Sequence, residues 1–546
     1  MWVSRQKAAR RSGWTIVVIA IAGLISFPIV TVLSGLFVDA RSTWQHLAET
    51  VLATYITNSL LLMGLVAIGV AVIGTGTAWL VTLCRFPASR SLTWALLLPL
   101  AAPAYILAYL YRNSLDVYGI VQTSLQSTLG WNTSQNDWFP DVRSLWGAAL
   151  MLILVLYPYV YLLARSAFLS QSVCTLEASR SLGCSPWQSF RKVALPLARP
   201  AIGAGVSLAL METLNDYATV QFFGVETFTT GIYHAWFGSG ERPAATQLSA
   251  LLLIFIFALI LIEQFSRGRR KYDQPSRSQA FERYQLRGIR AIAAFTFCIV
   301  PVLLGFLVPG GLLLKMTLSH WDQAFDGRFW NFASHSLIVS GLAAGSAIVL
   351  GMILAYGLRL NRSFTLRVAT SIASMGYAIP GSVIAVGILV PFGWLDNAID
   401  QWMRSTFNLS TGSLLSGTIF ALIFAYVVRF LALSLSRINS SLINIKPSLD
   451  DASRSLGFGA TATLLRIHIP LLWKGILAAA ILVFVDVMRE LSATLIVRPF
   501  NFDTLATHVY DLASEERLIE ASGSALAIVL VGLIPVILLS WQMEKS

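Results

Sequence analysis

The chain has 546 residues, of which 56% are hydrophobic and only 12% are charged, and its mean hydropathy is +0.69. Soluble proteins carry about 25% charged residues, so this composition excludes a soluble globular chain and points to lipid as the solvent. The net charge of +12 does not indicate nucleic-acid binding, because the basic residues lie between long apolar runs rather than on one face of a folded domain.

Twelve apolar runs are long enough to cross a bilayer, which takes about 20 helical residues. The first, from Trp14 to Phe37, follows four basic residues as in a signal peptide, but it exceeds the roughly 7 to 15 apolar residues of a cleaved leader, so we expect a retained helix. The sequence therefore predicts an all-α polytopic membrane protein with about twelve transmembrane helices. The other runs are 51–82, 91–113, 144–168, 197–221, 244–265, 290–318, 334–358, 368–394, 413–436, 471–497 and 521–542.

Lysine and arginine are unevenly distributed about these spans. On the side of the N-terminus the connecting segments hold 28 of them, the opposite side holds 9, and 2 lie within spans. Because cytoplasmic loops carry the excess of positive charge, both termini are expected in the cytoplasm. Acidic residues show the reverse preference, with 16 outside and 7 inside, so the outer face is suited to a cation or to a basic partner.

An internal repeat divides the chain into two homologous halves. Residues 178–183, ASRSLG, recur as 452–457 at an offset of 274, and an offset of 277 aligns the segments starting at Asn58 and His335. We expect a first half of six transmembrane helices (1–265) and a second half of six (291–546). The basic segment 266–290 between them is expected to be a cytoplasmic linker, with electrostatic binding to lipid as the alternative.

A hydrophilic segment follows the fourth span of each half on the inner face, and we call these segments the first coupling loop (172–196) and the second coupling loop (446–470). An acid, Glu177 or Asp451, is expected at the N-terminus of a short helix, where it complements the helix dipole. A glycine, Gly183 or Gly457, is expected to end that helix and turn the chain. Such a surface helix needs a partner surface; an amphipathic helix resting on lipid is the alternative.

The coupling loops resemble the EAA loop of ABC importer permeases, whose pattern is EAA-x3-G-x9-I-x-L-P. The first copy departs from it by Ser179 and Val193, and the second by Asp451, Ser453 and Ile469. The resemblance implies that each loop forms a coupling helix that docks in a cleft of an ATPase subunit. The coupling residues that it implies are Glu177, Ala178, Gly183, Asp451, Ala452 and Gly457.

Segments 211–238 and 485–518, and the double-length architecture, look most like the fused permeases of ferric-iron importers. The resemblance implies a multi-pass protein of the bacterial inner membrane that works by alternating access with two copies of an ABC ATPase subunit and a periplasmic or lipid-anchored iron-binding protein. Thiamine or another small cation is the alternative cargo, and a self-contained ion-coupled transporter is the alternative class.

No lysine follows a glycine, so the chain has no phosphate-binding loop of the G-x-x-x-x-G-K-[ST] type. We therefore expect a protein that is not an enzyme and binds no cofactor, with ATP and magnesium on the partner subunit.

Four carboxylates lie in the predicted spans, where an ionised group is costly. Each pair is spaced i, i+4, so each is expected to share one helix face. The two faces are expected to converge into an acidic mouth for a hard cation, with transient Fe³⁺ at Glu212 and Asp486 and no stably bound metal. The alternative is a structural role in which Arg489 pairs with one of the acids. The carboxylates are Glu212, Asp216, Asp486 and Glu490.

Two further pairs are expected to be equivalent between the halves. His234 and His508 align at the offset of 274, in outer loops, and Pro103 and Pro380 align at 277, inside the third span of each half. Each proline is expected either to shape the pathway or to produce an ordinary kink in a continuous helix.

Overall fold

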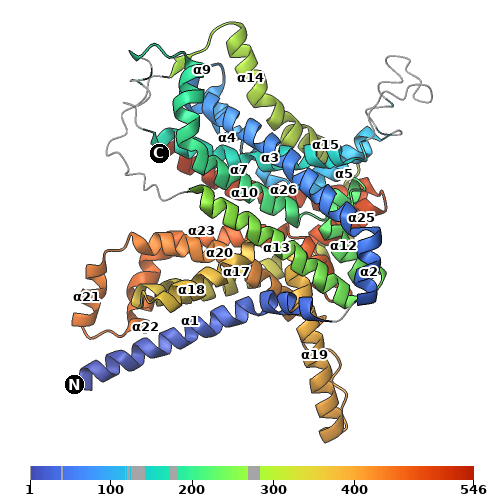
Figure 1. Cartoon of the computed structure of the whole chain (residues 1–546), viewed down its shortest axis with the longest axis vertical. Coiled ribbons are helices and arrows are strands. Elements are labelled where there is room, and N and C mark those ends of the chain that lie inside the picture. Colours follow the sequence, from blue (N-terminus) through green and yellow to red (C-terminus); the bar gives the residue numbers. More distant parts are fainter. Residues whose placement is uncertain are drawn as a thin grey trace. The chain divides into compact units, whose positions relative to one another are not determined.

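The computed structural model describes residues 2–38, 41–116, 142–171, 181–267 and 283–545, together with Gly119, Thr123, Glu177 and Ser179. In this part of the chain, eleven helices are long and apolar enough to cross a membrane, and the count becomes twelve if one bent helix pair is a single span. The predicted all-α polytopic fold is confirmed (Figure 1).

The chain forms two compact units whose boundaries differ from those of the sequence halves. Unit 1 contains residues 1–40, 235–250 and 327–508, and unit 2 contains 41–234, 251–326 and 509–546. The first helix is thus grouped with most of the second half, whereas the first and last spans of the second half are grouped with the first half.

Unit 1 is built on three helices, α17, α20 and α23, which pack side by side (Figure 1). Gly351 of α17 faces Ser434 of α20, whose hydroxyl donates to the carbonyl of Ala347 at 2.7 Å. Small residues at this contact let the two backbones approach closely. The helices of unit 1 are α1 (Trp2–Ser34), η1 (Gly35–Phe37), α17 (Gly327–Leu360), α18 (Phe364–Ala373), η6 (Met375–Ala378), α19 (Gly381–Phe407), α20 (Ile419–Ile443), α21 (Pro447–Ser455), α22 (Ala460–Thr463), η7 (Leu464–His468), α23 (Ile469–Met488) and α24 (Ser492–Val497).

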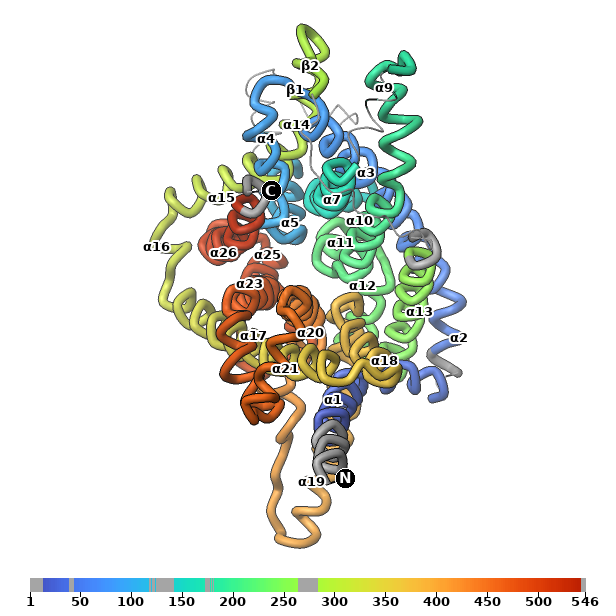
Figure 2. The backbone as a smooth tube through the Cα atoms, turned by 90° about the vertical axis from the view of Figure 1, so that its left-hand side faces the viewer, coloured from blue at the N-terminus to red at the C-terminus, as the bar shows by residue number. Residues whose placement is uncertain are grey.

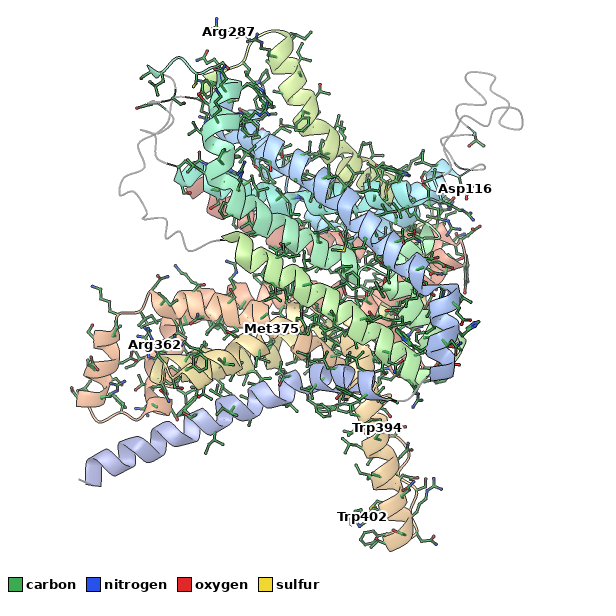
Figure 3. The ribbon with its side chains drawn as sticks, viewed as in Figure 1. Asp116, Arg287, Arg362, Met375, Trp394 and Trp402 are labelled. Atoms are coloured by element: carbon green, nitrogen blue, oxygen red, sulfur yellow. The ribbon has the colours of Figure 1, made fainter. Side chains whose placement is uncertain are left out.

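The far part of α19 carries Trp394 and Trp402 (Figure 3), and the segment after it folds back along the helix. Asp396 holds this return, because its carboxylate accepts hydrogen bonds from the backbone N–H groups of Leu414, Leu415 and Ser416 at 3.1, 2.9 and 2.8 Å. These N–H groups lie outside any helix, so the carboxylate supplies the acceptors that they would otherwise lack.

Unit 2 is built on α3, α7 and α10. Gly74 of α3 and Gly205 of α10 both lie against Val160 of α7, where a Cβ atom on either glycine would meet Val160 at 2.7 Å. Two short strands pair in parallel, Cys84 with Tyr284 and Arg85 with Gln285 (Figure 2). The elements of unit 2 are α2 (Arg41–Thr50), α3 (Leu52–Leu83), β1 (Cys84–Arg85), α4 (Ser89–Ala95), η2 (Leu98–Ala101), α5 (Ala104–Leu115), α7 (Leu145–Ser170), α9 (Pro186–Ser189), η3 (Phe190–Ala194), α10 (Leu195–Asn215), α11 (Ala218–Phe222), α12 (Phe228–Tyr233), β2 (Tyr284–Gln285), α14 (Ile289–Val302), η5 (Leu303–Leu307), α15 (Val308–Ser319), α16 (Trp321–Ala324) and α26 (Leu518–Lys545).

Three helices cross from one unit to the other along the chain: η4 (His234–Gly238), α13 (Arg242–Arg267) and α25 (Leu505–Ser514).

Pro103 and Pro380 do not lie inside continuous helices, so the expectation of a kinked span is wrong at both positions. Each proline precedes the first residue of a new helix, α5 or α19, and the residue before it is extended. In the first half the two helical pieces meet at 87°. Proline disfavours helical conformation in the preceding residue, so the chain breaks there rather than bending.

Candidate functional site

The two coupling loops repeat the same side-chain contact. Ser179 Oγ lies 2.8 Å from Ser189 Oγ in the first loop, and Ser453 Oγ lies 2.7 Å from Thr463 Oγ1 in the second. All four residues are buried. The offset of 274 relates Ser179 to Ser453 and Ser189 to Thr463, so the two contacts are equivalent. The hydroxyl pair therefore closes each loop onto the helix that leads into the next span.

Gly183 and Gly457 turn the chain as predicted. Their φ angles are +81° and +82°, a region that residues with a Cβ atom adopt at a cost. In the second loop the N–H of Phe458 donates to the carbonyl of Ser453, and in the first the N–H of Cys184 donates to that of Ser179, both at 3.0 Å. This is the hydrogen bond of a Schellman helix end.

The acid of the second coupling loop is placed differently from the prediction. Helix α21 begins at Pro447, because proline lacks an N–H and is tolerated at the first helical position. Asp451 therefore lies in the second turn, so its expected place at the helix N-terminus is wrong. Its carboxylate is exposed and pairs with Arg454 at 3.2 Å. Glu177 is also exposed, Ala452 lies on α21, and Ala178 lies outside the described residues.

One leucine before each turning glycine is exposed. Leu182 is 83% exposed and Leu456 is 75% exposed, and the two are equivalent at the offset of 274. A buried packing position for a leucine is worth about 1.5–3 kcal/mol relative to exposure. Each coupling loop thus presents one large apolar side chain directly before its turn, at equivalent positions in the two halves.

The four carboxylates do not share helix faces in pairs, and this expectation is wrong. Helix α10 ends at Asn215 and α23 ends at Met488, so Asp216 and Glu490 follow the helices that carry Glu212 and Asp486. Asp216 instead accepts from the N–H and hydroxyl of Thr219 at 2.8 and 2.9 Å.

Glu490 has the same role in the second half. It accepts from the N–H groups of Ala493 and Thr494 at 3.0 and 3.1 Å, at the start of α24. Asp216 and Glu490 thus each hold the first turn of the short helix that follows, α11 or α24.

The two halves differ in how they compensate these charges. Asp486 pairs with Arg489, as the structural alternative anticipated, and Arg429 of α20 pairs with Glu490. Among the described residues, no lysine, arginine or histidine pairs with Glu212 or Asp216. Within the described ranges, the acids without a basic partner are therefore those of the first half. Because the two pairs lie in different units, their convergence stays a prediction.

Gly381 makes room for the ion pair of the second half. A Cβ atom at this position would collide with the Arg429 guanidinium and would come within 2.7 Å of Glu490 Oε1. The equivalent residue in the first half is Ala104, and the residue equivalent to Arg429 is Leu152 or Val155, depending on which repeat offset is applied. The glycine and the arginine occur together in one half, and both are missing from the other.

The segments that follow the short helices α11 and α24 also repeat, but the offset between them is 277 instead of 274. Asn58 donates to the Glu226 carbonyl at 2.9 Å, and the His335 ring nitrogen lies 3.0 Å from the Asp503 carbonyl oxygen. These pairs align at 277, so His234 and His508 are not equivalent, and this expectation is wrong.

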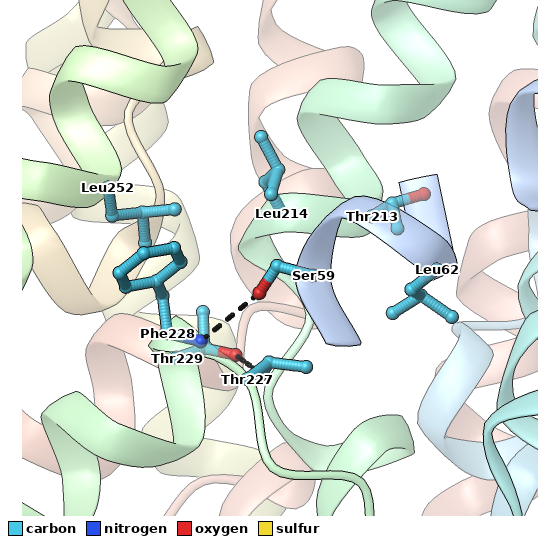
Figure 4. A pocket seen from close by; sticks show the side chains of 8 residues that line it. All are labelled: Ser59, Leu62, Thr213, Leu214, Thr227, Phe228, Thr229 and Leu252. Atoms are coloured by element: carbon cyan, nitrogen blue, oxygen red, sulfur yellow. Dashed lines mark hydrogen bonds between the residues drawn. The ribbon is translucent and has the colours of Figure 1, made fainter. Parts of the chain in front are cut away.

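Ser59 makes the neighbouring contact in unit 2, accepting from the N–H of Phe228 at 3.4 Å beside a small pocket (Figure 4). Its counterpart Ser336 accepts from Leu505 at 2.8 Å in unit 1. The residues that line the pocket are Ser59, Leu62, Thr213, Leu214, Thr227, Phe228, Thr229 and Leu252.

Within the described ranges, no three His, Cys, Asp or Glu side chains are grouped so that they could hold a metal ion.

A duplicated set of membrane helices with a matched loop structure in each half defines a polytopic membrane protein of the transport-permease class. The chain belongs to the family of binding-protein-dependent transport system inner membrane components, which matches residues 10–271 and 347–544.

Named relatives are similar to this chain over different lengths. The "Fe(3+)-transport system permease protein FbpB 2" of Haemophilus influenzae is 27% identical over 530 residues, covering 94% of this chain and 96% of that protein. The "Ferric transport system permease protein FbpB" of Actinobacillus pleuropneumoniae is 25% identical over 554 residues, covering 95% and 76%. The "Putative 2-aminoethylphosphonate transport system permease protein PhnV" of Salmonella typhimurium is 27% identical over 240 residues, covering 44% and 81%.

Proposed function

We propose that this chain is the permease of an ATP-driven importer that receives ferric iron from a periplasmic or lipid-anchored binding protein and moves it to the cytoplasm by alternating access. Two copies of a separate ATPase subunit bind the coupling loops and hydrolyse ATP with magnesium. The protein is a multi-pass component of the bacterial inner membrane with both termini in the cytoplasm.

The observation that carries this proposal is the matched geometry of the two coupling loops. Each has a buried hydroxyl pair, a left-handed glycine and a highly exposed leucine at equivalent positions. Two equivalent surfaces suit two copies of one partner. The implied coupling roles of Glu177, Ala178, Gly183, Asp451, Ala452 and Gly457 belong to this proposal.

Contacts within unit 1 support the placement of the N-terminus. The ring of Trp14 lies edge-on to that of Tyr356, with 5.3 Å between centroids, and the Tyr356 hydroxyl donates to the Ala460 carbonyl at 2.9 Å. The start of the first span and the second coupling loop therefore lie at the same end of this unit. If the loop is cytoplasmic, the N-terminus is too.

Ferric iron is favoured as cargo by the full-length relatives whose names carry it and by the uncompensated acids Glu212 and Asp216. A hard cation prefers oxygen ligands, and these two carboxylates have no competing basic partner among the residues that the structure describes. Asp486 and Glu490 are already paired with arginines, so we assign the cation pathway chiefly to the acids of the first half.

Uptake by the reconstituted complex tests the proposal. The chain is purified with its ATPase, placed in vesicles with its binding protein, and supplied with radioactive ferric iron or with thiamine. ATP-dependent accumulation of iron supports the proposal, and accumulation of thiamine alone contradicts the cargo. Uptake that continues without ATP and stops when a proton gradient is dissipated contradicts the mechanism in favour of an ion-coupled transporter.

A further inference from the structure

The second coupling loop contains a largely shielded carboxylate that the repeat does not share. Asp450 lies in the first turn of α21, next to Asp451, but its side chain is 13% exposed whereas that of Asp451 is 72% exposed. A carboxylate that has lost most of its contact with water needs compensating partners. Asp450 has two, and they come from two other helical segments of unit 1.

Arg359, in the last turn of α17, is the first partner. Its Nε and Nη2 atoms lie 2.9 and 2.7 Å from Asp450 Oδ2. The same guanidinium donates to the carbonyls of Leu442 and Ile445 at the end of α20, at 2.5 and 2.9 Å. A guanidinium compensates both a carboxylate and the negative end of a helix, so Arg359 joins α17, α20 and α21.

His468 is the second partner, and it is completely buried. Its Nε2 atom lies 2.7 Å from Asp450 Oδ1, whereas Nδ1 has no hydrogen-bond partner in the described part of the chain. A neutral ring with its proton on Nε2 can donate to the carboxylate without leaving a buried N–H unpaired. His468 ends η7, directly before α23, so the contact joins α21 to the helix that carries Asp486.

The three residues of this network are not repeated in the sequence of the first half. The offset of 274 relates Asp450 to Leu176 and His468 to Ala194, and the offset of 277 relates Arg359 to Thr82. Gln171 donates instead to the Ala194 carbonyl at 2.9 Å. Both loops share the buried hydroxyl pair, and in the described part of the chain the second loop is also fixed by charged groups.

We propose that Asp450 is a positioning residue that locks the second coupling helix to α17, α20 and α23, so that this helix passes motion of its ATPase subunit to the membrane helices as one body. This inference rests on the proposed function, because it assigns a mechanical role within the coupling loops.

The test is the number of ATP molecules hydrolysed per iron imported in vesicles that contain the whole complex. Asp450→Asn keeps the size of the side chain but removes its charge, and Asp322→Asn is the control at an exposed acid outside the coupling loops. We expect Asp450→Asn to raise the ratio at least about fivefold, the lower range of a typical coupling effect. We expect Asp322→Asn to leave it unchanged and Asp450→Glu to recover part of the coupling.

Assembly is measured in parallel by co-purification of the ATPase. A variant that binds a normal amount of ATPase is folded, so a loss of coupling in that variant is not the result of misfolding. If Asp450→Asn does not assemble, His468→Ala, which keeps the Arg359 contact, is measured in its place with the same expected direction. A normal ratio in an assembled variant overturns the inference. The unaltered complex separates this inference from the proposed function. If it imports iron with ATP, a normal ratio in the variant overturns only the inference. If it does not import iron, the proposed function itself fails.

Discussion

The guanidinium of Arg429 lies 2.8 Å from the carboxylate of Glu490, and the two side chains are only 6% and 3% exposed. Glu490 also accepts two backbone N–H groups at the start of α24. The pair therefore connects α20 to the segment that follows α23. Removing one member of a buried pair leaves the other charge without compensation. This destabilises a protein more than replacing both members by apolar residues.

Replacing Arg429 by methionine should destabilise the protein strongly, by roughly 3–5 kcal/mol. Thermal unfolding of the purified protein in detergent measures the effect. Arg437→Met, at an exposed position on the same helix, should change little. Adding Glu490→Gln to Arg429→Met should recover part of the loss, and equal stability of Arg429→Met and Arg437→Met would contradict the role of the pair.

Gly381→Ala should disturb the same ion pair from a third position. The new methyl group would press on Arg429 and Glu490, and overpacking of this kind costs about 1–3 kcal/mol. Gly341→Ala on α17 is the control, because no atom lies within 4 Å of its Cβ position. The same unfolding measurement should show a loss for Gly381→Ala alone; a stable Gly381→Ala variant would mean that the ion pair adjusts freely.

The exposed leucines of the coupling loops should be needed for ATPase binding but not for folding. Leu182→Asp and Leu456→Asp place a charge on each proposed docking surface while leaving buried contacts intact. Each variant should reach the membrane in normal amount and co-purify with less ATPase. Undiminished ATPase binding in the double variant would show that these side chains do not lie in the interface.

The acids of the two halves should respond unequally to loss of charge. Glu212→Gln removes a carboxylate that no basic residue of the described chain pairs with, and it should lower iron uptake severalfold at unchanged protein abundance. Glu226→Gln, an exposed acid of the same unit, is its control. Asp486→Asn removes the carboxylate charge that pairs with Arg489 and should act mainly on stability. Normal uptake by Glu212→Gln would remove this residue from the pathway.

The spans and the coupling-loop turns could be predicted from sequence because each depends on local chemistry. Long apolar runs determine the transmembrane helices, and a glycine after a short polar helix predicts the left-handed turn at Gly183 and Gly457. The helix ends at Asn215 and Met488 could not be predicted in this way. Asp216 follows the first of them and Arg489 and Glu490 follow the second, but apolar residues return directly afterwards, so the apolar pattern alone does not distinguish a continuing span from a break.

The equivalence of His234 and His508 failed because three residues are inserted between the two short helices and the segments that follow them. A matching pattern was present, since Thr227 and Thr230 align with Thr504 and Thr507 at the offset of 277. The Asp450 network was also missed. Its signal is weak, because Arg359 and His468 are single polar residues at the two ends of apolar helices, and their meeting depends on the tertiary fold.

Site-specific photocross-linking from positions 182 and 456 in the intact membrane tests the central claim most directly. A photoreactive residue replaces Leu182 or Leu456, and the cross-linked products are identified after illumination. Our account predicts that both positions capture the ATPase subunit. Capture of phospholipid from both positions, with no ATPase product while the complex is assembled, would contradict it.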